Sequence, residues 1–111
     1  MFAIAPEVVA EVSPLAEPIS LSTREEMEAY IIREYPVYAQ DMIRVIECES
    51  DFNPSIGGDL RENGYTSWGL SQIHLPAHPS VSKEEAQDPE FAIRFMGESF
   101  AKGQQEMWSC Y

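Results

Sequence analysis

The pattern of apolar and polar positions predicts a first helix over residues 22–34. Ser22 and Glu25 fit a capping box, in which the serine is the N-cap and the glutamate is the third helical residue. Three apolar side chains then recur at the three- and four-residue spacing of one helix face: Met27, Tyr30 and Ile31. Proline has no backbone N–H, so Pro36 ends this helix and is suited to begin the next one.

A second amphipathic helix is predicted over residues 36–50, and it carries two glutamates of different character. Its apolar positions cluster around one direction on the helix: Met42, Ile43, Val45 and Ile46. At about 100° per residue, Glu49 lies only about 40° from the centre of that cluster. Glu47 lies about 120° from it. The pattern therefore turns Glu49 toward the apolar side of the helix.

Glu49 is a candidate general acid because of this placement. Burial and the negative end of the helix dipole both favour the neutral carboxyl. A raised pKa is what a general acid needs if it is to work near neutral pH. The alternative is a glutamate at the helix edge that pairs with another group and has no chemical role.

A small β-hairpin is predicted after the second helix. Asn53 precedes a proline and is therefore pushed out of the helical conformation. Asn63 and Gly64 form a strong two-residue turn signal, which places strands over residues 56–62 and 65–70. Because two short strands are not stable alone, the hairpin must pack against the helices.

The next segment is predicted to be a loop. His74 and His78 have the spacing of a metal pair on one helix face, but two prolines prevent a helix there. We therefore interpret both histidines as solvated or hydrogen-bonded loop residues. Ser82 and Glu85 resemble a second capping box, at the start of one short helical turn.

A further helix is predicted over residues 88–102. Asp88 is a good N-cap, Pro89 suits the first helical position and Gly103 suits the C-cap. Gly97 costs about 1 kcal/mol of helix propensity, which indicates a close approach of another group to its backbone. Together these elements predict an α+β fold that is predominantly helical and carries one hairpin.

The composition describes one acidic domain of 111 residues, with 7 Lys and Arg against 19 Asp and Glu and a formal net charge of −12. This charge argues against a nucleic-acid partner, because such binding requires neutralisation of phosphates. No apolar run approaches the roughly 18 residues of a spanning helix, so no transmembrane segment is predicted. Residues 1–21 are interpreted as a flexible tail or linker, either a natural start or the remainder after a signal peptide was removed, and the domain covers residues 22–111.

The two cysteines, Cys48 and Cys110, allow one disulfide or are two reduced, buried thiols. A disulfide would close a loop of about 60 residues and stabilise the fold by roughly 4 kcal/mol in the chain-entropy model. Neither cysteine has a second Cys or His at ligand spacing, so no metal site is predicted, and no cofactor is expected.

Three motifs in sequence order resemble those of the soluble lytic transglycosylases. Residues 46–54, IECESDFNP, are similar to the family's glutamate-serine motif and to the aromatic-Asn-Pro turn that follows it. Residues 69–72, GLSQ, stand at the spacing of its Gly-Leu-Met-Gln element. The third motif is similar to its Asp-Pro, Asn-Ile and Gly pattern: Asp88, Pro89, Ile93 and Gly97. The resemblance covers residues 42–100 and implies a lysozyme-like fold with a small hairpin beside an active-site cleft.

The resemblance also implies roles for individual residues. Glu49 would be the single general acid/base, which protonates the glycosidic oxygen and then removes the proton of the muramic C6 hydroxyl. Hydrolysis of lysozyme type would need a second carboxylate, for which Asp59 is the candidate. Five further residues are candidates for substrate binding: Ser50, Asn53, Tyr65, Trp68 and Gln72. The family's later Ala-Tyr-Asn motif, whose tyrosine helps to position the acid, is missing, so that role is lost or taken by another residue.

The expected function is that of a peptidoglycan lytic transglycosylase, which cleaves the β-1,4 bond between N-acetylmuramic acid and N-acetylglucosamine and leaves 1,6-anhydro ends. The expected partner is the peptidoglycan glycan strand, and we expect an exported monomer in the cell envelope or outside the cell. A hydrolytic muramidase that uses Glu49 and Asp59 is one alternative. A non-catalytic glycan-binding module and a helical protein-interaction domain are the others.

Overall fold

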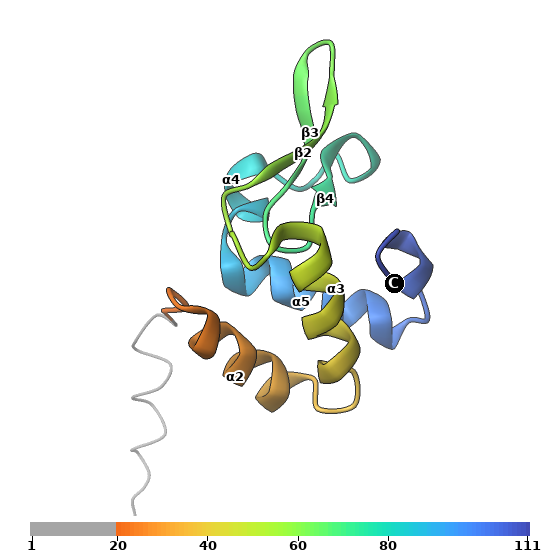
Figure 1. Cartoon of the computed structure of the whole chain (residues 1–111). Helices are drawn as coiled ribbons and strands as arrows, with labels where there is room; N and C mark the ends of the chain where they lie inside the picture. The colour runs from red at the N-terminus through yellow and green to blue at the C-terminus, as the bar shows by residue number, and fades with distance from the viewer. Residues whose placement is uncertain (1–19) are drawn as a thin grey trace, which may run out of the picture.

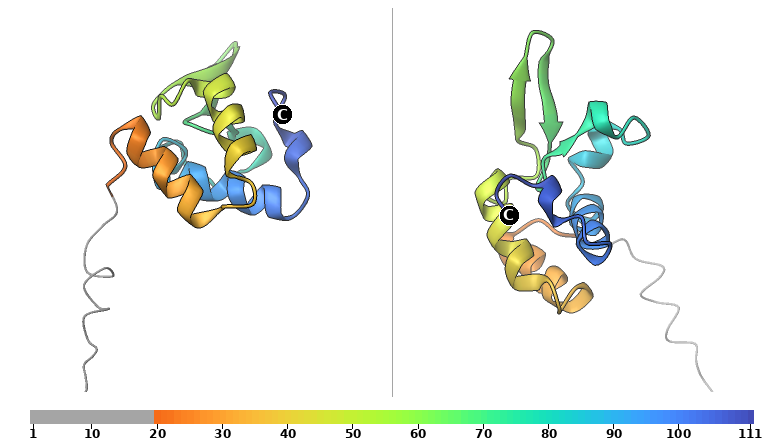
Figure 2. Two further views of the ribbon diagram at one scale, coloured as in Figure 1. Left: turned by 60° about the horizontal axis from the view of Figure 1, so that its bottom comes forward. Right: turned by 90° about the vertical axis from the view of Figure 1, so that its right-hand side faces the viewer.

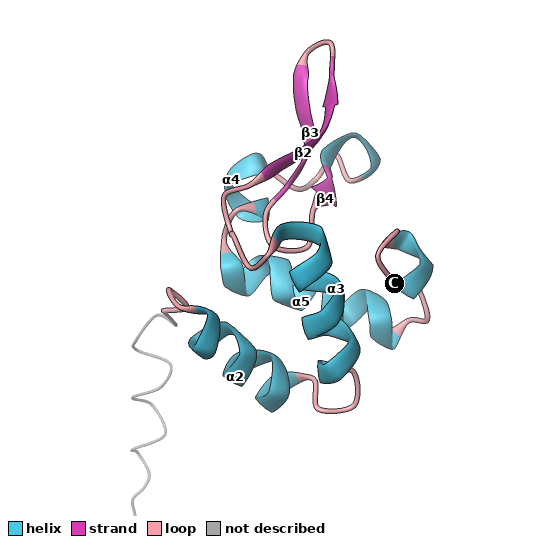
Figure 3. Cartoon of the chain, viewed as in Figure 1, coloured by secondary structure: helices cyan, strands magenta, loops and turns pink. Residues whose placement is uncertain are grey.

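The computed structural model describes residues 20–111, so most of the predicted tail lies outside the described residues. The described part is an α+β fold, about half of it helical (Figure 1, Figure 3). Its elements in chain order are α2 (Arg24–Glu34), α3 (Ala39–Ser50), β2 (Gly57–Arg61), β3 (Gly64–Trp68), β4 (Ile73–His74), η2 (Leu75–Ala77), α4 (Lys83–Ala86), α5 (Pro89–Ala101) and η3 (Gln105–Met107). The predicted α+β class is confirmed.

Helix α2 has the predicted capping box, but one residue later than the sequence analysis placed it. Thr23 is the N-cap, and its side chain accepts from the backbone N–H of Glu26 at 3.1 Å. Glu26 in turn accepts from the backbone N–H groups of Ser22 and Thr23. The apolar positions of the helix are buried as predicted: Met27, Tyr30 and Ile31. The sequence fits either register, because hydroxyl and glutamate residues both occur in pairs there.

Helix α3 begins at Ala39, so the prediction that Pro36 opens it is wrong. The intervening residues form a turn, in which the N–H of Tyr38 donates to Tyr35 O at 3.0 Å. This turn reverses the chain between α2 and α3 (Figure 1). Because residues 36–38 form this turn, Pro36 lies before the helix and not in its first turn.

The sheet has three antiparallel strands in the order β2-β3-β4, one more than predicted. The hairpin turn consists of Glu62 and Asn63, because Gly64 pairs with Arg61. Gly64 has a φ of 104°, a conformation that glycine adopts readily, and it is the first residue of β3 rather than part of the two-residue turn. The predicted turn is therefore shifted by one residue.

The second strand ends earlier than predicted because the chain turns again at residues 69–72. Gly69 has a φ of 85°, and a Cβ there would collide with the carbonyl of Ala86 in α4. The turn brings His74 back beside Ser67 in register, so His74 belongs to β4 and not to the predicted loop. The glycine thus permits both the turn and the close contact of the sheet with α4.

The last two helices agree closely with the predictions. Ser82 and Glu85 form the capping box of α4, and Asp88 caps α5 with Pro89 in its first turn. Helix α5 crosses behind α3 in Figure 1 and contributes to the core together with α2 and α3. The hairpin extends away from this helical body (Figure 2).

Candidate active site

Glu49 lies in the last turn of α3, one residue before the helix ends at Ser50. Its side chain is half-buried, whereas Glu47 is 55% exposed and pairs with Arg24 at 3.2 Å. The backbone N–H of Cys110 donates to Glu49 Oε2 at 3.2 Å. Helix α3 thus turns Glu49 inward and Glu47 outward, as the helical pattern predicts.

The pKa of Glu49 is raised above its ordinary value of 4.5, and burial of the carboxyl is the largest cause. The negative charge of Asp59 raises it further. Hydrogen bonds from the Cys110 backbone and the Ser109 side chain act in the opposite direction, because they stabilise the ionised form. Burial prevails, so the carboxyl holds its proton to a higher pH than a solvated glutamate does.

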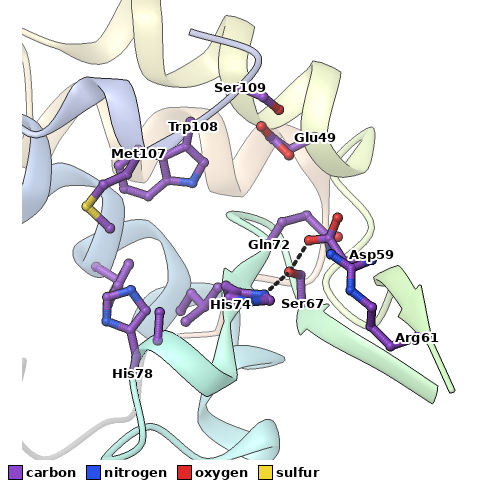
Figure 4. Close-up of a pocket in the computed structure, with 13 residues that line it drawn as sticks. Glu49, Asp59, Arg61, Ser67, Gln72, His74, His78, Met107, Trp108 and Ser109 are labelled. Atoms are coloured by element: carbon purple, nitrogen blue, oxygen red, sulfur yellow. Dashed lines mark hydrogen bonds between the residues drawn. The ribbon is translucent and has the colours of Figure 1, made fainter. Parts of the chain in front are cut away.

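Glu49 faces a cavity of about 640 Å³ (Figure 4). This volume lies within the range of small-molecule binding sites. The lining residues come from α3, the sheet and the turn before β4, η2 and the residue after it, α5 and the C-terminal segment: Glu49, Asp59, Arg61, Ser67, Gln72, Ile73, His74, Ala77, His78, Phe95, Met107, Trp108 and Ser109. Two carboxyl groups therefore open into one cavity that also has an apolar wall.

A hydrogen-bonded chain crosses the three strands on the wall that faces Glu49 (Figure 4). The hydroxyl of Ser67, a residue only 1% exposed, bonds to Asp59 Oδ2 and lies 3.2 Å from His74 Nδ1. Asp59 has a φ of 56°, a left-handed conformation that is uncommon for a non-glycine residue in a strand. The backbone therefore accepts strain where it directs this carboxylate to Ser67.

The chemistry of this chain follows from its single hydroxyl hydrogen. When Ser67 donates to the Asp59 carboxylate, its oxygen can accept only from a His74 that carries a proton on Nδ1. Asp59 is then an oriented acceptor on the wall opposite Glu49, whose raised pKa favours the protonated form. Two carboxyl groups in different environments on one cavity are a usual arrangement for acid and base work.

Of the five predicted substrate-binding residues, one lines the cavity and four lie elsewhere. Gln72 lines the cavity, and its side chain amide also donates to Ile56 O and Gly69 O. Ser50 is buried and donates to Leu70 O at 2.8 Å, which ties α3 to the turn before β4. The Gln72 amide and the Ser50 hydroxyl therefore make their hydrogen bonds within the protein, without a ligand.

Like Ser50, the other three predicted residues lie outside this cavity. Asn53 accepts from the backbone N–H of Ser55 and shapes the turn after α3. Tyr65 is 50% exposed and packs edge-to-face on Trp68, with ring centroids 5.8 Å apart. Trp68 is half-buried beneath the ammonium group of Lys83, which lies 4.2 Å from its ring centroid.

Ten of the thirteen residues that line the cavity were not among the predicted site residues, and these ten include Ser67, His74, Trp108 and Ser109. The two cysteines in the sequence could have indicated that Trp108 and Ser109 lie near Glu49. The structure joins Cys48 to Cys110 by a disulfide, which is one of the two states that the sequence left open. Because these cysteines are adjacent in sequence to Glu49 and Ser109, the bridge brings the C-terminal segment to the candidate acid.

Comparisons of this chain with family models, curated proteins and solved structures found no match. Within residues 20–111, no three His, Cys, Asp or Glu side chains are grouped so that they could hold a metal ion. No helix in that range has the length and apolar character needed to cross a membrane.

Proposed function

We propose that this protein is a peptidoglycan lytic transglycosylase with a lysozyme-like fold and with Glu49 as its single general acid/base. The observation that supports this most directly is a half-buried carboxyl of raised pKa that faces a cavity of about 640 Å³. The motif order in the sequence supplies the substrate class, and the helical body with its hairpin is consistent with the family's architecture.

In the proposed reaction, neutral Glu49 donates its proton to the glycosidic oxygen between N-acetylmuramic acid and N-acetylglucosamine as that bond breaks. The Glu49 carboxylate then takes the proton of the muramic C6 hydroxyl, whose oxygen bonds to the anomeric carbon. The products are a 1,6-anhydro-muramic end and a free hydroxyl on the leaving sugar. One titrating group is sufficient because the nucleophile belongs to the substrate.

A hydrolytic muramidase is the second candidate, and Asp59 is the observation that favours it. Asp59 lines the same cavity as Glu49 and is oriented by Ser67. Hydrolytic glycosidases use such a pair, one carboxyl as acid and the other as base or nucleophile. In that case water attacks the anomeric carbon, and the product has a reducing end.

Digestion of purified peptidoglycan followed by mass spectrometry tests the proposal. Anhydro-muropeptides released by the parent protein and absent with Glu49→Gln are the expected result, with Glu47→Gln as the matched control on the exposed face of α3. Reducing-end products alone would replace the transglycosylase by the muramidase. Glycan binding with no cleavage by folded parent protein would leave a non-catalytic binding module.

Export of the protein is part of this proposal, because peptidoglycan lies outside the cytoplasm. The Cys48–Cys110 disulfide supports it, since such bonds form and persist mainly in oxidising compartments. Recovery of the oxidised protein in the envelope or secreted fraction is expected. Recovery of only the reduced form in the cytoplasm would contradict export.

A further inference from the structure

The C-terminal segment, residues 107–111, forms the part of the cavity wall nearest to Glu49. Three of its residues line the cavity: Met107, Trp108 and Ser109. In Figure 4 the Ser109 side chain points toward the Glu49 carboxyl. The next residue, Cys110, donates its backbone N–H to that carboxyl at 3.2 Å. We call residues 107–111 the C-terminal strap.

The strap is fixed to the body on both sides of its contact with Glu49. The Trp108 indole N–H donates to Ser71 O at 2.6 Å in a buried position, and its ring packs against Phe100 at a centroid distance of 5.5 Å. Cys110 is bonded to Cys48, the residue immediately before Glu49 in α3. A covalent link thus lies directly beside the hydrogen bond.

Arg44 supplies a second tether, independent of the disulfide. It lies on α3, and its guanidinium donates to Cys110 O at 3.1 Å and to Tyr111 O at 3.4 Å. The same group lies 5.7 Å from the centroid of the Tyr111 ring. The helix that carries Glu49 therefore holds the strap at two places, Arg44 and Cys48.

We propose that the C-terminal strap is a positioning segment for Glu49, held in place jointly by the Cys48–Cys110 disulfide and by Arg44. Its catalytic meaning rests on the proposed function, whereas its effect on the carboxyl does not. The strap orients the carboxyl through the Cys110 N–H and excludes solvent through Trp108 and Ser109.

Removal of the strap has two opposed effects on the pKa of Glu49. Loss of the Cys110 and Ser109 donors raises that pKa, and loss of cover lowers it. Burial by the whole protein is the largest cause of the raised pKa in the intact molecule. Release of the strap therefore changes the pKa of Glu49, and the sign of the change shows whether the lost donors or the lost cover contribute more. Four other titratable or charged side chains face the cavity and stay in place: Asp59, Arg61, His74 and His78.

A double-mutant cycle tests the proposal: Arg44→Gln, the pair Cys48→Ser with Cys110→Ser, and all three together. Arg33→Gln is the matched control, because that exposed arginine of α2 makes no contact with the strap. If two tethers hold one segment, loss of both reduces kcat by more than the product of the separate effects. We expect roughly a 100-fold decrease in kcat for the triple variant, since misplacement by about 1 Å is this costly.

A measurement without substrate separates this proposal from the proposed function. Titration of the Glu49 carboxyl by carbon-detected NMR should give a different pKa in the triple variant from that in the parent, and the Trp108 indole resonance should shift. This result would support the strap even if the parent does not cleave peptidoglycan. An unchanged Glu49 titration in a folded triple variant would overturn the proposal.

Arg44→Gln keeps the disulfide and decides the question if the cysteine variants do not fold. The substitution removes a charged donor to the strap, so it should reduce kcat about tenfold and change KM less. It should also shift the pKa of Glu49 relative to Arg33→Gln. If Arg44→Gln matches Arg33→Gln in both kcat and the Glu49 titration, Arg44 and the strap have no positioning role.

Discussion

Replacement of Gly97 by alanine tests how closely α5 packs against the end of α2. The ring of Tyr35 lies against the Gly97 backbone, and its Cε2 is 2.6 Å from the place that a Cβ would take. The ring is buried, and its hydroxyl donates to Glu98 Oε2 at 3.1 Å. An added methyl group must therefore move Tyr35 away from a satisfied position.

The magnitude follows from three terms. Alanine gains about 1 kcal/mol of helix propensity over glycine. Overpacking of a dense core costs about 1–3 kcal/mol, and a hydrogen bond to a charged acceptor contributes about 1.5–3 kcal/mol. We expect Gly97→Ala to lower the free energy of unfolding by about 1.5–5 kcal/mol, which corresponds to a Tm lower by about 6–40 °C.

Urea denaturation of a four-member cycle measures this effect and its cause. In a Tyr35→Ala background the collision is absent, so Gly97→Ala should instead stabilise the protein by about 1 kcal/mol. An equal loss in both backgrounds would show that the Tyr35 ring is not responsible. A Gly97→Ala protein as stable as the parent would refute the close packing itself.

Three further predictions concern the walls of the cavity. Glu49→Gln should raise the free energy of unfolding at neutral pH and leave it unchanged below about pH 4, measured by thermal melts across pH. The pKa of Glu49 is raised in the folded protein. Such a group contributes stability below its unfolded-state pKa, and this contribution is lost as the pH rises. Glutamine does not ionise, so the variant does not suffer this loss at neutral pH. Trp108→Phe should cost about 1–3 kcal/mol in urea denaturation, since Ser71 O loses its buried donor. Ser67→Ala should slow the release of reducing-end products more than anhydro products in a muropeptide assay, with rescue by Ser67→Thr, because it removes the bond that orients Asp59.

Local signals in the sequence were sufficient for most of the helices. Capping residues and apolar spacing act within a few residues, so they located α4 and α5 and the inward turn of Glu49. The errors were shifts of one to three residues where two local solutions compete. Thr23 rather than Ser22 caps α2, and the turn after Tyr35 replaces the first turn of α3.

The cavity was less predictable because long-range contacts assemble it. Asp59, Ser67 and His74 come from three strands. Nothing in the neighbouring sequence indicates that Asp59 will adopt a left-handed conformation and direct its carboxylate toward Ser67. The short strand β4 has only two residues, too few for any periodic pattern. Trp108 has a buried ring, as expected of a core residue, and also one edge in the cavity wall.

The tip of the β-hairpin is less supported by neighbouring strands than its base. Beyond Ser67 the hairpin has no third strand beside it, and Leu60 and Tyr65 are 66% and 50% exposed there (Figure 2). Backbone amides near the tip should therefore exchange with deuterium well before those of the β3–β4 pairs. Since Ser67 anchors Asp59 close to the base, motion of the tip would leave that carboxylate in its place.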